Sequence, residues 1–500
     1  MQSFNMGHKM RVLLALWFAS LALSAQAQPN ISAQAQPNIV VILTDDQDVS
    51  SAYGWSQSLN RTFMPNLAEL AERGITFKNA FNNNPLCSPS RATWQSGQEA
   101  HNHGIERNEY ETGDAYGIWK ASEGNSLPVW LQSAGYRTGY LGKHLNGSFD
   151  TPVNGYVAPD KTRVPVGWDN WQVMAQRGYF NWELNDNGRL VSYGSNAGAY
   201  QTDVLTEKAV LFIEDEDEER PFFLMVAPFS PHTDGRNTVT PAPRHASTFS
   251  NEPLPQGPAF NEADVTDKPG FIKNLSALTA NDEQAWFDYV RSLFHRPLTV
   301  NDVRSLFRKR LNALQSVDDL IGSVINAVNE AGKLNDTCFV FASDNGKSLG
   351  DHRFVGKGVA YEASLRIPLV IACPGMKKET REQLVTNVDL VPTILQWAGA
   401  TPGRTQDGKS LVNLLSDEQT PWRSAFFIEG PGRRWTGVRT VTHKYVKQTK
   451  SGFEELYDLV HDPDELQNKA GDPTYAGTLN QMRDLLDRLS ACTGAGCWTE

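Results

Sequence analysis

Short apolar runs between residues 38 and 372 predict the strands of a buried sheet. The residues in each run are apolar at successive positions instead of alternating with polar ones. Such runs are typical of strands covered on both faces, as in parallel sheets flanked by helices. The predicted strands are 38–44, 137–141, 222–227, 338–342 and 369–372.

Helical patterns lie between these runs. Residues 65–73 begin at a proline and end before Gly74, and residues 126–134 begin at a capping serine and end before Gly135. Residues 303–331 are amphipathic over their whole length and predict one long helix, broken at most once. Strands alternating with helices predict an α/β sandwich around a large, mostly parallel central sheet.

The pattern changes after about residue 395. Short alternating runs at 426–428, 435–442, 444–446 and 456–459 predict an antiparallel sheet, and residues 479–489 predict a helix packed on it. We therefore expect a main α/β domain over residues 38–395 and a smaller C-terminal antiparallel-sheet subdomain over residues 396–500.

The first residues resemble a secretory signal. Lys9 and Arg11 precede an apolar run at 12–23, and Ala25-Gln26-Ala27 is a small-x-small cleavage site. We expect a signal peptide at 1–27, a flexible leader at 28–37, and export to the periplasm or the extracellular space. No later stretch reaches the ~20 apolar residues of a membrane span, so we expect no stable membrane anchor.

Charge and cysteine content narrow the function. A net charge of −11 argues against general nucleic-acid binding, although a local cluster of cations can still bind an anionic substrate. Of the five cysteines, Cys492 and Cys497 could close a small loop, since export permits disulfides. Cys338 and Cys373 lie in apolar runs, and we expect them to be buried thiols. Cys87 is the remaining cysteine and belongs to neither of these two sets.

Polar residues follow four of the predicted strands. Open α/β sheets place their binding sites at the carboxyl ends of the strands, so we expect these residues to share one edge of the sheet. Lys143 follows 137–141 and His232 follows 222–227. The residues after 38–44 and 338–342 are three carboxylates and an amide. Oxygen donors of this kind suit Ca²⁺ or Mg²⁺. The predicted metal ligands are Asp45, Asp46, Asp344 and Asn345.

The pentapeptide Cys87-Ser88-Pro89-Ser90-Arg91 resembles the signature of the type I sulfatases. In that family a maturation enzyme oxidises the cysteine to formylglycine, an aldehyde. One hydroxyl of the hydrated aldehyde attacks sulfur, and the other loses its proton and expels sulfate as the aldehyde re-forms. The nucleophile therefore brings its own release step, which an ordinary serine or cysteine lacks.

The resemblance implies an alkaline-phosphatase-like fold, a calcium ion that Cys87 also helps to bind, and further site residues. Arg91 anchors the modified Cys87, Lys143 and Lys357 bind the sulfate, and His232 donates a proton to the leaving oxygen. His144, directly after Lys143 where many members have Lys-x-His, and His352 are the candidate substrate contacts.

The resemblance runs from residue 38 to about residue 473, and it is closest to the N-acetylglucosamine-6-sulfatase and heparan endosulfatase branch. The segments that carry it include Val166-Gly167-Trp168-Asp169, Ser316-Val317-Asp318-Asp319 and Glu455-Leu456-Tyr457-Asp458-Leu459. This branch implies a sulfated carbohydrate, or another sulfate ester, as substrate.

Two other interpretations stay open. The chain can be a phosphonate monoester or phosphodiester hydrolase of the same superfamily, because sulfate and phosphate are both tetrahedral oxyanions. It can also be an exported carbohydrate-binding protein on an inactive sulfatase scaffold. Assays on sulfate and phosphate esters separate the first two interpretations, and mass spectrometry of the Cys87 peptide tests the third.

Overall fold

The computed structural model describes residues 36–110, 113–147, 160–215, 219–234, 238–278 and 298–499. The chain divides into two units, Met1–Ala35 and Gln36–Glu500, and everything below concerns the second. The predicted signal peptide and nearly all of the predicted leader lie outside the described residues. In the part of the chain described, no helix combines the length and apolarity needed to cross a bilayer.

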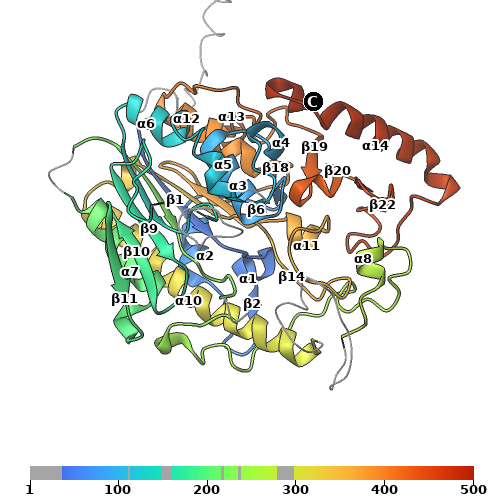
Figure 1. Cartoon of the computed structure of the whole chain (residues 1–500), viewed down its shortest axis with the longest axis horizontal. Coiled ribbons are helices and arrows are strands. Elements are labelled where there is room, and N and C mark those ends of the chain that lie inside the picture. Colours follow the sequence, from blue (N-terminus) through green and yellow to red (C-terminus); the bar gives the residue numbers. More distant parts are fainter. Residues whose placement is uncertain are drawn as a thin grey trace, which may run out of the picture. The chain divides into compact units, whose positions relative to one another are not determined.

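A ten-stranded mixed sheet forms the centre of the second unit (Figure 1). Its five middle strands, β9, β8, β12, β1 and β13, run parallel to one another, which confirms the mostly parallel sheet. In spatial order the strands are β11 (Arg189–Tyr193), β10 (Trp182–Asp186), β9 (Asn170–Gln176), β8 (Arg137–Gly142), β12 (Phe222–Ala227), β1 (Asn38–Thr44), β13 (Thr337–Ser343), β16 (Leu369–Ala372), β4 (Ile75–Phe77) and β17 (Glu379–Arg381).

Strand β16 was expected to be one of the parallel strands, but it runs antiparallel to β13. After β13 the chain stays at the carboxyl end of that strand, where it forms β14 (Ser348–Leu349), β15 (Val355–Gly356) and α11 (Glu362–Leu365). The next strand therefore starts at that end and runs back. The apolar pattern could not reveal this direction, because both faces of β16 are buried either way.

Helices cover both faces of the sheet, as the side chains of β1 illustrate. Ile39, Val41 and Leu43 belong to one hydrophobic cluster, and Val40 and Ile42 belong to another. The first cluster includes residues of α3 (Cys87–Ser96), α6 (Leu127–Ser133) and α12 (Leu390–Ala398), and the second includes residues of α2 (Pro65–Ala71), α7 (Gln201–Ile213) and α10 (Val300–Glu330). The α/β sandwich is confirmed.

Helix α10 is a single unbroken helix of 31 residues, so the break allowed for in the prediction is absent. It starts three residues before the predicted position. Thr299 and Asp302 form a capping box there, in which each side chain accepts a hydrogen bond from the other residue's main chain.

The cysteines correct a second expectation. Cys338 and Cys373 form a disulfide instead of remaining buried thiols. The antiparallel pairing of β13 with β16 explains the bond, because Cys338 and Cys373 lie one position outside the Phe339–Ala372 pair. Cys492 and Cys497 form the disulfide that the sequence suggested, and Cys87 is the one free thiol among the residues described.

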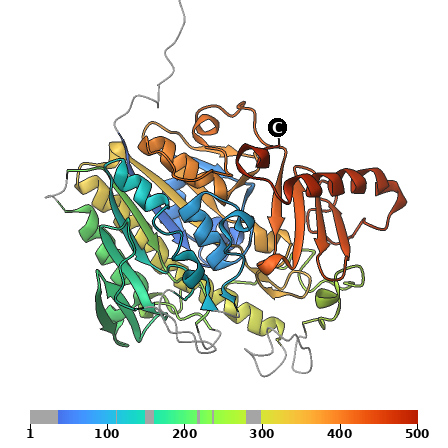
Figure 2. The ribbon, with the colours of Figure 1, turned by 45° about the horizontal axis from the view of Figure 1, so that its top comes forward.

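The C-terminal part contains a separate four-stranded antiparallel sheet, here called the C-terminal sheet, as predicted (Figure 2). Leu479, Met482 and Leu486 of the last helix pack on this sheet against Phe427 and Val438. The sheet consists of β19 (Ala425–Glu429), β20 (Trp435–Thr440), β21 (His443–Gln448) and β22 (Glu454–Asp458), and the helix is α14 (Ala476–Leu489). The domain boundary at residue 395 stays a prediction.

Candidate active site

The predicted polar residues meet at the carboxyl edge of the parallel strands, around Cys87. Cys87 is the first residue of α3, and only 1% of it is exposed. The strands β1, β8, β12 and β13 end at this edge, and Asp45, Lys143, His232 and Asp344 follow them in that order, whereas Lys357 follows the short strand β15 (Val355–Gly356). Segments more than 250 residues apart in sequence therefore contribute to one small volume.

Two lysines contact the Cys87 thiol. The Lys143 Nζ lies 3.3 Å from the Cys87 Sγ, and the Lys357 Nζ lies 2.7 Å from it. Each lysine also pairs with a carboxylate, Lys143 with Asp45 and Lys357 with Asp46. The arrangement places two ammonium groups beside the sulfur atom, where they can contact an anionic group.

The end of β8 brings Lys143 into place through a glycine. Gly142 has a φ of +105°, and a Cβ atom on it would meet the main-chain oxygen of Ala227 at 2.1 Å. The absence of a side chain lets the Lys143 main-chain N–H donate to that same oxygen at 2.8 Å. The close approach of β8 to β12 therefore fixes where Lys143 leaves the sheet.

The carboxylates of Asp45 and Asp46, the Cys87 thiol and the His232 ring form a group suited to a cation. One ligand atom from each lies within 4.8 Å of the others. Asn345 donates to the Asp46 Oδ1 at 2.8 Å, and the Asp46 main-chain N–H donates to the Asp344 Oδ1 at 3.0 Å. The sequence did not predict His232 as a member of this group.

The donor set fits a hard divalent cation. The Oδ1 atom of Asn345 is buried and has no hydrogen-bond partner within the described ranges, so one amide oxygen is left to bind something else. Carboxylate and amide oxygens are the ligands that Ca²⁺ and Mg²⁺ prefer. Asp344 differs from the two aspartates of β1, because its carboxylate is held mainly by Arg91.

Charge around the site sets the ionisation of these groups. Burial opposes ionisation of Asp45, but Lys143, His232 and Arg91 outweigh it and hold the pKa of Asp45 below its usual range. Burial and the nearby Asp45 carboxylate raise the pKa of Asp344 to about 6. Burial and Asp45 also raise the pKa of the Cys87 thiol to about 11. An unmodified Cys87 is therefore protonated at neutral pH and is a poor nucleophile.

Arg91 lies one helical turn after Cys87 and is fully buried. Its Nε donates to the Asp344 Oδ2 at 3.0 Å, and its Nη1 donates to the main-chain oxygen of Lys143 at 2.6 Å. A second nitrogen, Nη2, lies 2.9 Å from the same Asp344 oxygen. The guanidinium thus fixes an aspartate from β13 and the lysine after β8 relative to the helix that carries Cys87.

His232 faces the aspartates from the loop after β12. Its Nε2 lies 3.8 Å from the Asp46 Oδ2, and its Nδ1 lies 2.5 Å from the main-chain oxygen of Thr233. Because that oxygen can only accept, Nδ1 carries a hydrogen. The Nε2 of a neutral ring is then unprotonated, and donation from it requires the doubly protonated ring.

His144 and His352 are not members of the group formed by Asp45, Asp46, Cys87 and His232. The His144 ring packs edge-to-face on Tyr140, with ring centroids 5.2 Å apart, and its Nε2 lies 2.7 Å from the Gln95 Nε2. His352 is buried, and its Nδ1 lies 2.6 Å from a Glu262 carboxylate oxygen. The structure gives both rings protein neighbours, and the mechanism proposed below uses neither.

Sequence reasoning missed two cations at the site. The Lys347 Nζ lies 3.1 Å from the Asp46 Oδ2, and Lys347 comes two residues after Asn345, which was the available signal. Arg310 of α10 donates to the main-chain oxygen of Asp46 at 2.5 Å and to that of Pro231 at 3.1 Å. The sequence feature that could have indicated Arg310 is its position, because it is a charged residue on the apolar face of α10.

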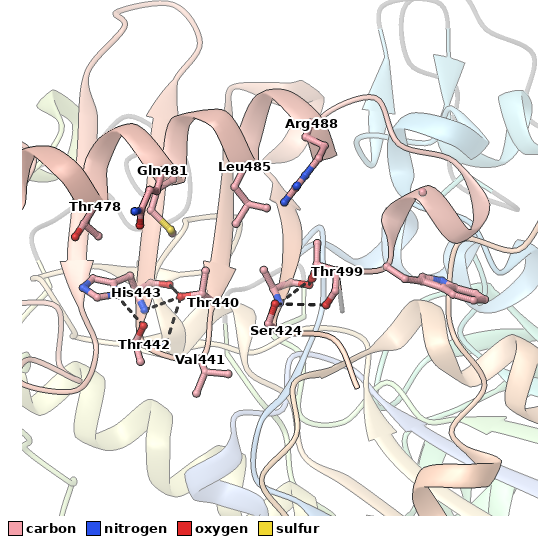
Figure 3. A pocket seen from close by; sticks show the side chains of 14 residues that line it. Ser424, Thr440, Val441, Thr442, His443, Thr478, Gln481, Leu485, Arg488 and Thr499 are labelled. Atoms are coloured by element: carbon pink, nitrogen blue, oxygen red, sulfur yellow. Dashed lines mark hydrogen bonds between the residues drawn. The ribbon is translucent and has the colours of Figure 1, made fainter. Parts of the chain in front are cut away.

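A cavity of about 650 Å³ lies elsewhere, between α14 and the C-terminal sheet (Figure 3). Thr478 and Gln481 of α14 face His443 across it, and Arg488 faces Ser424 and Thr499. None of the predicted site residues lines this cavity, so it is separate from the group around Cys87.

Known proteins share both the sequence and the fold. A family model described as "Sulfatase" matches residues 37–400, and one described as "N-sulphoglucosamine sulphohydrolase, C-terminal" matches residues 350–492. The N-acetylglucosamine-6-sulfatase of Homo sapiens is 32% identical over 510 residues, which span 92% of this chain and 86% of the human protein. The N-acetylglucosamine-6-O-sulfatase of Bacteroides thetaiotaomicron is 28% identical over 95% of this chain and 90% of its own.

Solved structures agree on the fold. One, in complex with its substrate D-glucosamine-2-N,6-O-disulfate, has a TM-score of 0.72 and 24% identity, and the match covers 91% of this chain and 97% of that one. The phosphonate monoester hydrolase of Agrobacterium radiobacter has a TM-score of 0.66 and 21% identity over 91% and 95% of the two chains.

The solved structures and the mixed sheet define the class of protein as an alkaline-phosphatase-like α/β fold. Within that class, the chain belongs to the sulfatase family and is a sulfuric ester hydrolase. The family resemblance that the sequence suggested is thereby confirmed.

Proposed function

We propose that this chain is an exported sulfatase that hydrolyses sulfate esters of a sulfated carbohydrate of the glycosaminoglycan type. The observation that carries the proposal is the contact of two lysines, Lys143 and Lys357, with one buried thiol at a cluster of carboxylates. The relatives named as N-acetylglucosamine-6-sulfatases support glucosamine 6-sulfate as the first substrate to test.

The proposed nucleophile is formylglycine, made from Cys87 by a maturation enzyme. One hydroxyl of the hydrated aldehyde loses its proton to solvent and its oxygen bonds to sulfur, the bond from sulfur to the sugar oxygen breaks, and the sugar oxygen takes a proton. The second hydroxyl then loses its proton, the carbonyl re-forms, and sulfate leaves. The unreactive thiol that burial produces at Cys87 is consistent with a need for this modification.

The proposed metal is Ca²⁺, with Mg²⁺ as the alternative. Asp45, Asp46, Asp344 and Asn345 would hold it together with the modified Cys87. When bound, such an ion stabilises negative charge on oxygen as a Lewis acid. The buried carboxylates and the unpartnered Asn345 Oδ1 support this assignment.

The protein's own residues divide the remaining work. Lys143 and Lys357 bind the sulfuryl oxygens, because their ammonium groups already surround the Cys87 sulfur. Arg91 keeps Asp344 and Lys143 in place through three nitrogen atoms. His232 is the proposed proton donor to the leaving sugar oxygen. Burial lowers the pKa of its ring to about 3, so this role requires the anionic sulfuryl group to stabilise the protonated ring.

We also propose that residues 1–27 direct export to the periplasm or the extracellular space. The N-terminal charge and apolar run support this localisation, as does the likeness to proteins named as extracellular sulfatases. The chain spans 55% of the worm (Caenorhabditis elegans) relative with that name, to which it is 31% identical.

Hydrolysis of phosphonate monoesters or phosphodiesters is not favoured. The solved phosphonate monoester hydrolase is only 21% identical, so that likeness concerns the fold alone. The curated relatives at 28–32% identity are named as sulfatases. Parallel assays on defined sulfated oligosaccharides and on matched phosphate esters test this preference. Desulfation alone is expected, and faster turnover of the phosphate esters would contradict it.

A further inference from the structure

We propose that the C-terminal sheet positions Lys357 for the reaction and that Trp435 is the positioning residue at the centre of this contact. The inference rests on the proposed role of Lys357. It assigns a part in catalysis to a sheet that contributes none of the predicted site residues.

The first contact is immediately after Lys357. The indole N–H of Trp435 donates to the main-chain oxygen of Gly358 at 3.1 Å, and Trp435 is only 3% exposed. Gly358 has a φ of +81°, and a Cβ on it would meet the Pro431 ring at 3.2 Å. The chain next to Lys357 therefore has a hydrogen bond to Trp435 and little free space beside Pro431, and both residues border the same β19–β20 connection.

Further contacts follow within four residues. The Tyr361 hydroxyl donates to a Glu455 carboxylate oxygen of β22 at 3.0 Å. The Glu362 carboxylate lies 3.4 Å from Arg439 of β20 and 3.4 Å from Lys444 of β21. Helix α11, which begins at Glu362, accordingly lies beside the C-terminal sheet (Figure 1). Three of the four strands thus bind the segment that follows Lys357.

The remaining strand, β19, binds the chain just before Cys87. The Glu429 N–H donates to the Asn83 main-chain oxygen at 2.9 Å, and the Asn83 side chain donates to the Phe427 main-chain oxygen at 3.0 Å. The same small sheet therefore contacts both the loop that leads to the nucleophile and the loop that presents Lys357.

Lys357 needs this external support because its own hairpin is small. The strands β14 and β15 have two residues each and form two residue pairs. A lysine side chain has four rotatable bonds, so its ammonium reaches the Cys87 sulfur reliably only if the main chain is fixed. Misplacement of a reacting group by about 1 Å can cost roughly 100-fold in rate.

The test is a double-mutant cycle between Trp435→Phe and Lys357→Ala in the matured enzyme. Phenylalanine keeps an aromatic ring but loses the N–H donor and part of the indole volume, and the control variant must lose both as well. Trp422→Phe is the matched control, because the Trp422 indole also donates to a main-chain oxygen, that of Leu384 at 2.8 Å, which lies outside the segment 357–362. Sulfate release from an activated aryl sulfate is measured for every variant, normalised to the aldehyde content at residue 87 by mass spectrometry.

We expect Trp435→Phe to lower kcat/KM roughly 10- to 100-fold when Lys357 is present and about twofold or less in the Lys357→Ala background. Trp422→Phe should leave the rate unchanged. An equal loss in both backgrounds, or no loss in either, would overturn the inference. If Trp435→Phe does not fold, Tyr361→Phe is used instead and should show the same dependence on Lys357. A wild-type enzyme that releases no sulfate would contradict the proposed function, which is a different result.

Discussion

The Lys357 Nζ lies 2.7 Å from the Cys87 Sγ, although 270 positions separate the two residues in sequence. Lys143 approaches the same sulfur from another strand, at 3.3 Å. Because the sulfur marks the position of the proposed nucleophile, both ammonium groups lie where the sulfuryl oxygens of a substrate would bind. Substitutions at Lys357 and at His232 should therefore affect different parts of the reaction.

Lys357→Ala and His232→Ala should differ in how their effects depend on the leaving group. Lys357 binds the sulfuryl group that all substrates share, so its loss should lower kcat/KM by comparable factors on an aryl sulfate and on a sulfated sugar. His232 assists the departing oxygen, and a phenol with a low pKa needs little assistance. We expect His232→Ala to lose about 100-fold on the sugar and far less on the aryl ester. Equal losses on the two substrates would argue against His232 as the proton donor.

The proposed metal site leads to a prediction about stability as well as activity. Calcium should raise the unfolding temperature of the chelated protein and restore its activity, because an ion that binds only the folded state stabilises that state. Asp46→Asn should weaken both effects, since Asp46 belongs to the group of possible ligands. Asp186→Asn is the control, because Asp186 pairs with Lys208 outside the site. Full activity of the chelated wild type would refute a role for the metal.

Arg310 should be essential for stability, because it holds two loops of the site together. It is 1% exposed and lies 3.1 Å from the Asp48 carboxylate, while also binding the main chain at Asp46 and Pro231. Arg310→Met leaves the Asp48 carboxylate buried without its cation, which costs about 3 kcal/mol of unfolding free energy. Urea denaturation measures this difference. Arg308→Met, which removes a contact with the Glu252 main-chain oxygen, should cost much less.

Glu99 should make stability depend on pH. Burial, followed by the neighbouring Asp407 and Glu429 carboxylates, raises the pKa of Glu99 well above its usual value. A carboxyl whose pKa is raised in the folded state stabilises the fold at low pH, and this contribution is lost as pH rises through the folded-state pKa. Glu99→Gln mimics the protonated form and can keep the hydrogen bond from Asn83.

The unfolding midpoint of Glu99→Gln should accordingly exceed that of the wild type at pH 8 and equal it near pH 4. Thermal unfolding of the two proteins at both pH values tests this expectation. A constant difference between them at the two pH values would contradict the assignment. Glu69→Gln, at an exposed ion pair on α2, is the matched control and should show no such dependence.

Much of the fold could be predicted because its strands are uninterrupted apolar runs. Strands 222–227 and 369–372 have the predicted bounds in the structure. The direction of β16 and the disulfide between Cys338 and Cys373 could not be predicted, because a strand buried on both faces has the same pattern in either direction. The predicted oxygen donors come together because polar residues after parallel strands share an edge.

The parts that sequence reasoning missed depend on contacts between distant residues. Arg310 is one of seventeen buried residues of α10, and nothing local indicates that its partners are the loops after β1 and β12. Asp318, in a segment that carried the family resemblance, accepts hydrogen bonds from the N–H groups of Asn66 and Leu67 and so caps α2. Its role is therefore structural, and no periodicity in α10 could distinguish it from a site residue.

The central claim is that Cys87, once converted to formylglycine, is the nucleophile of a sulfatase. The most direct measurement is sulfate release from N-acetylglucosamine 6-sulfate by wild type and Cys87→Ala, each produced with a maturation enzyme and checked by mass spectrometry at residue 87. The account predicts an aldehyde and sulfate release in the wild type, and neither in Cys87→Ala, with equal unfolding midpoints for the two proteins. Sulfate release by Cys87→Ala at the wild-type rate would contradict it.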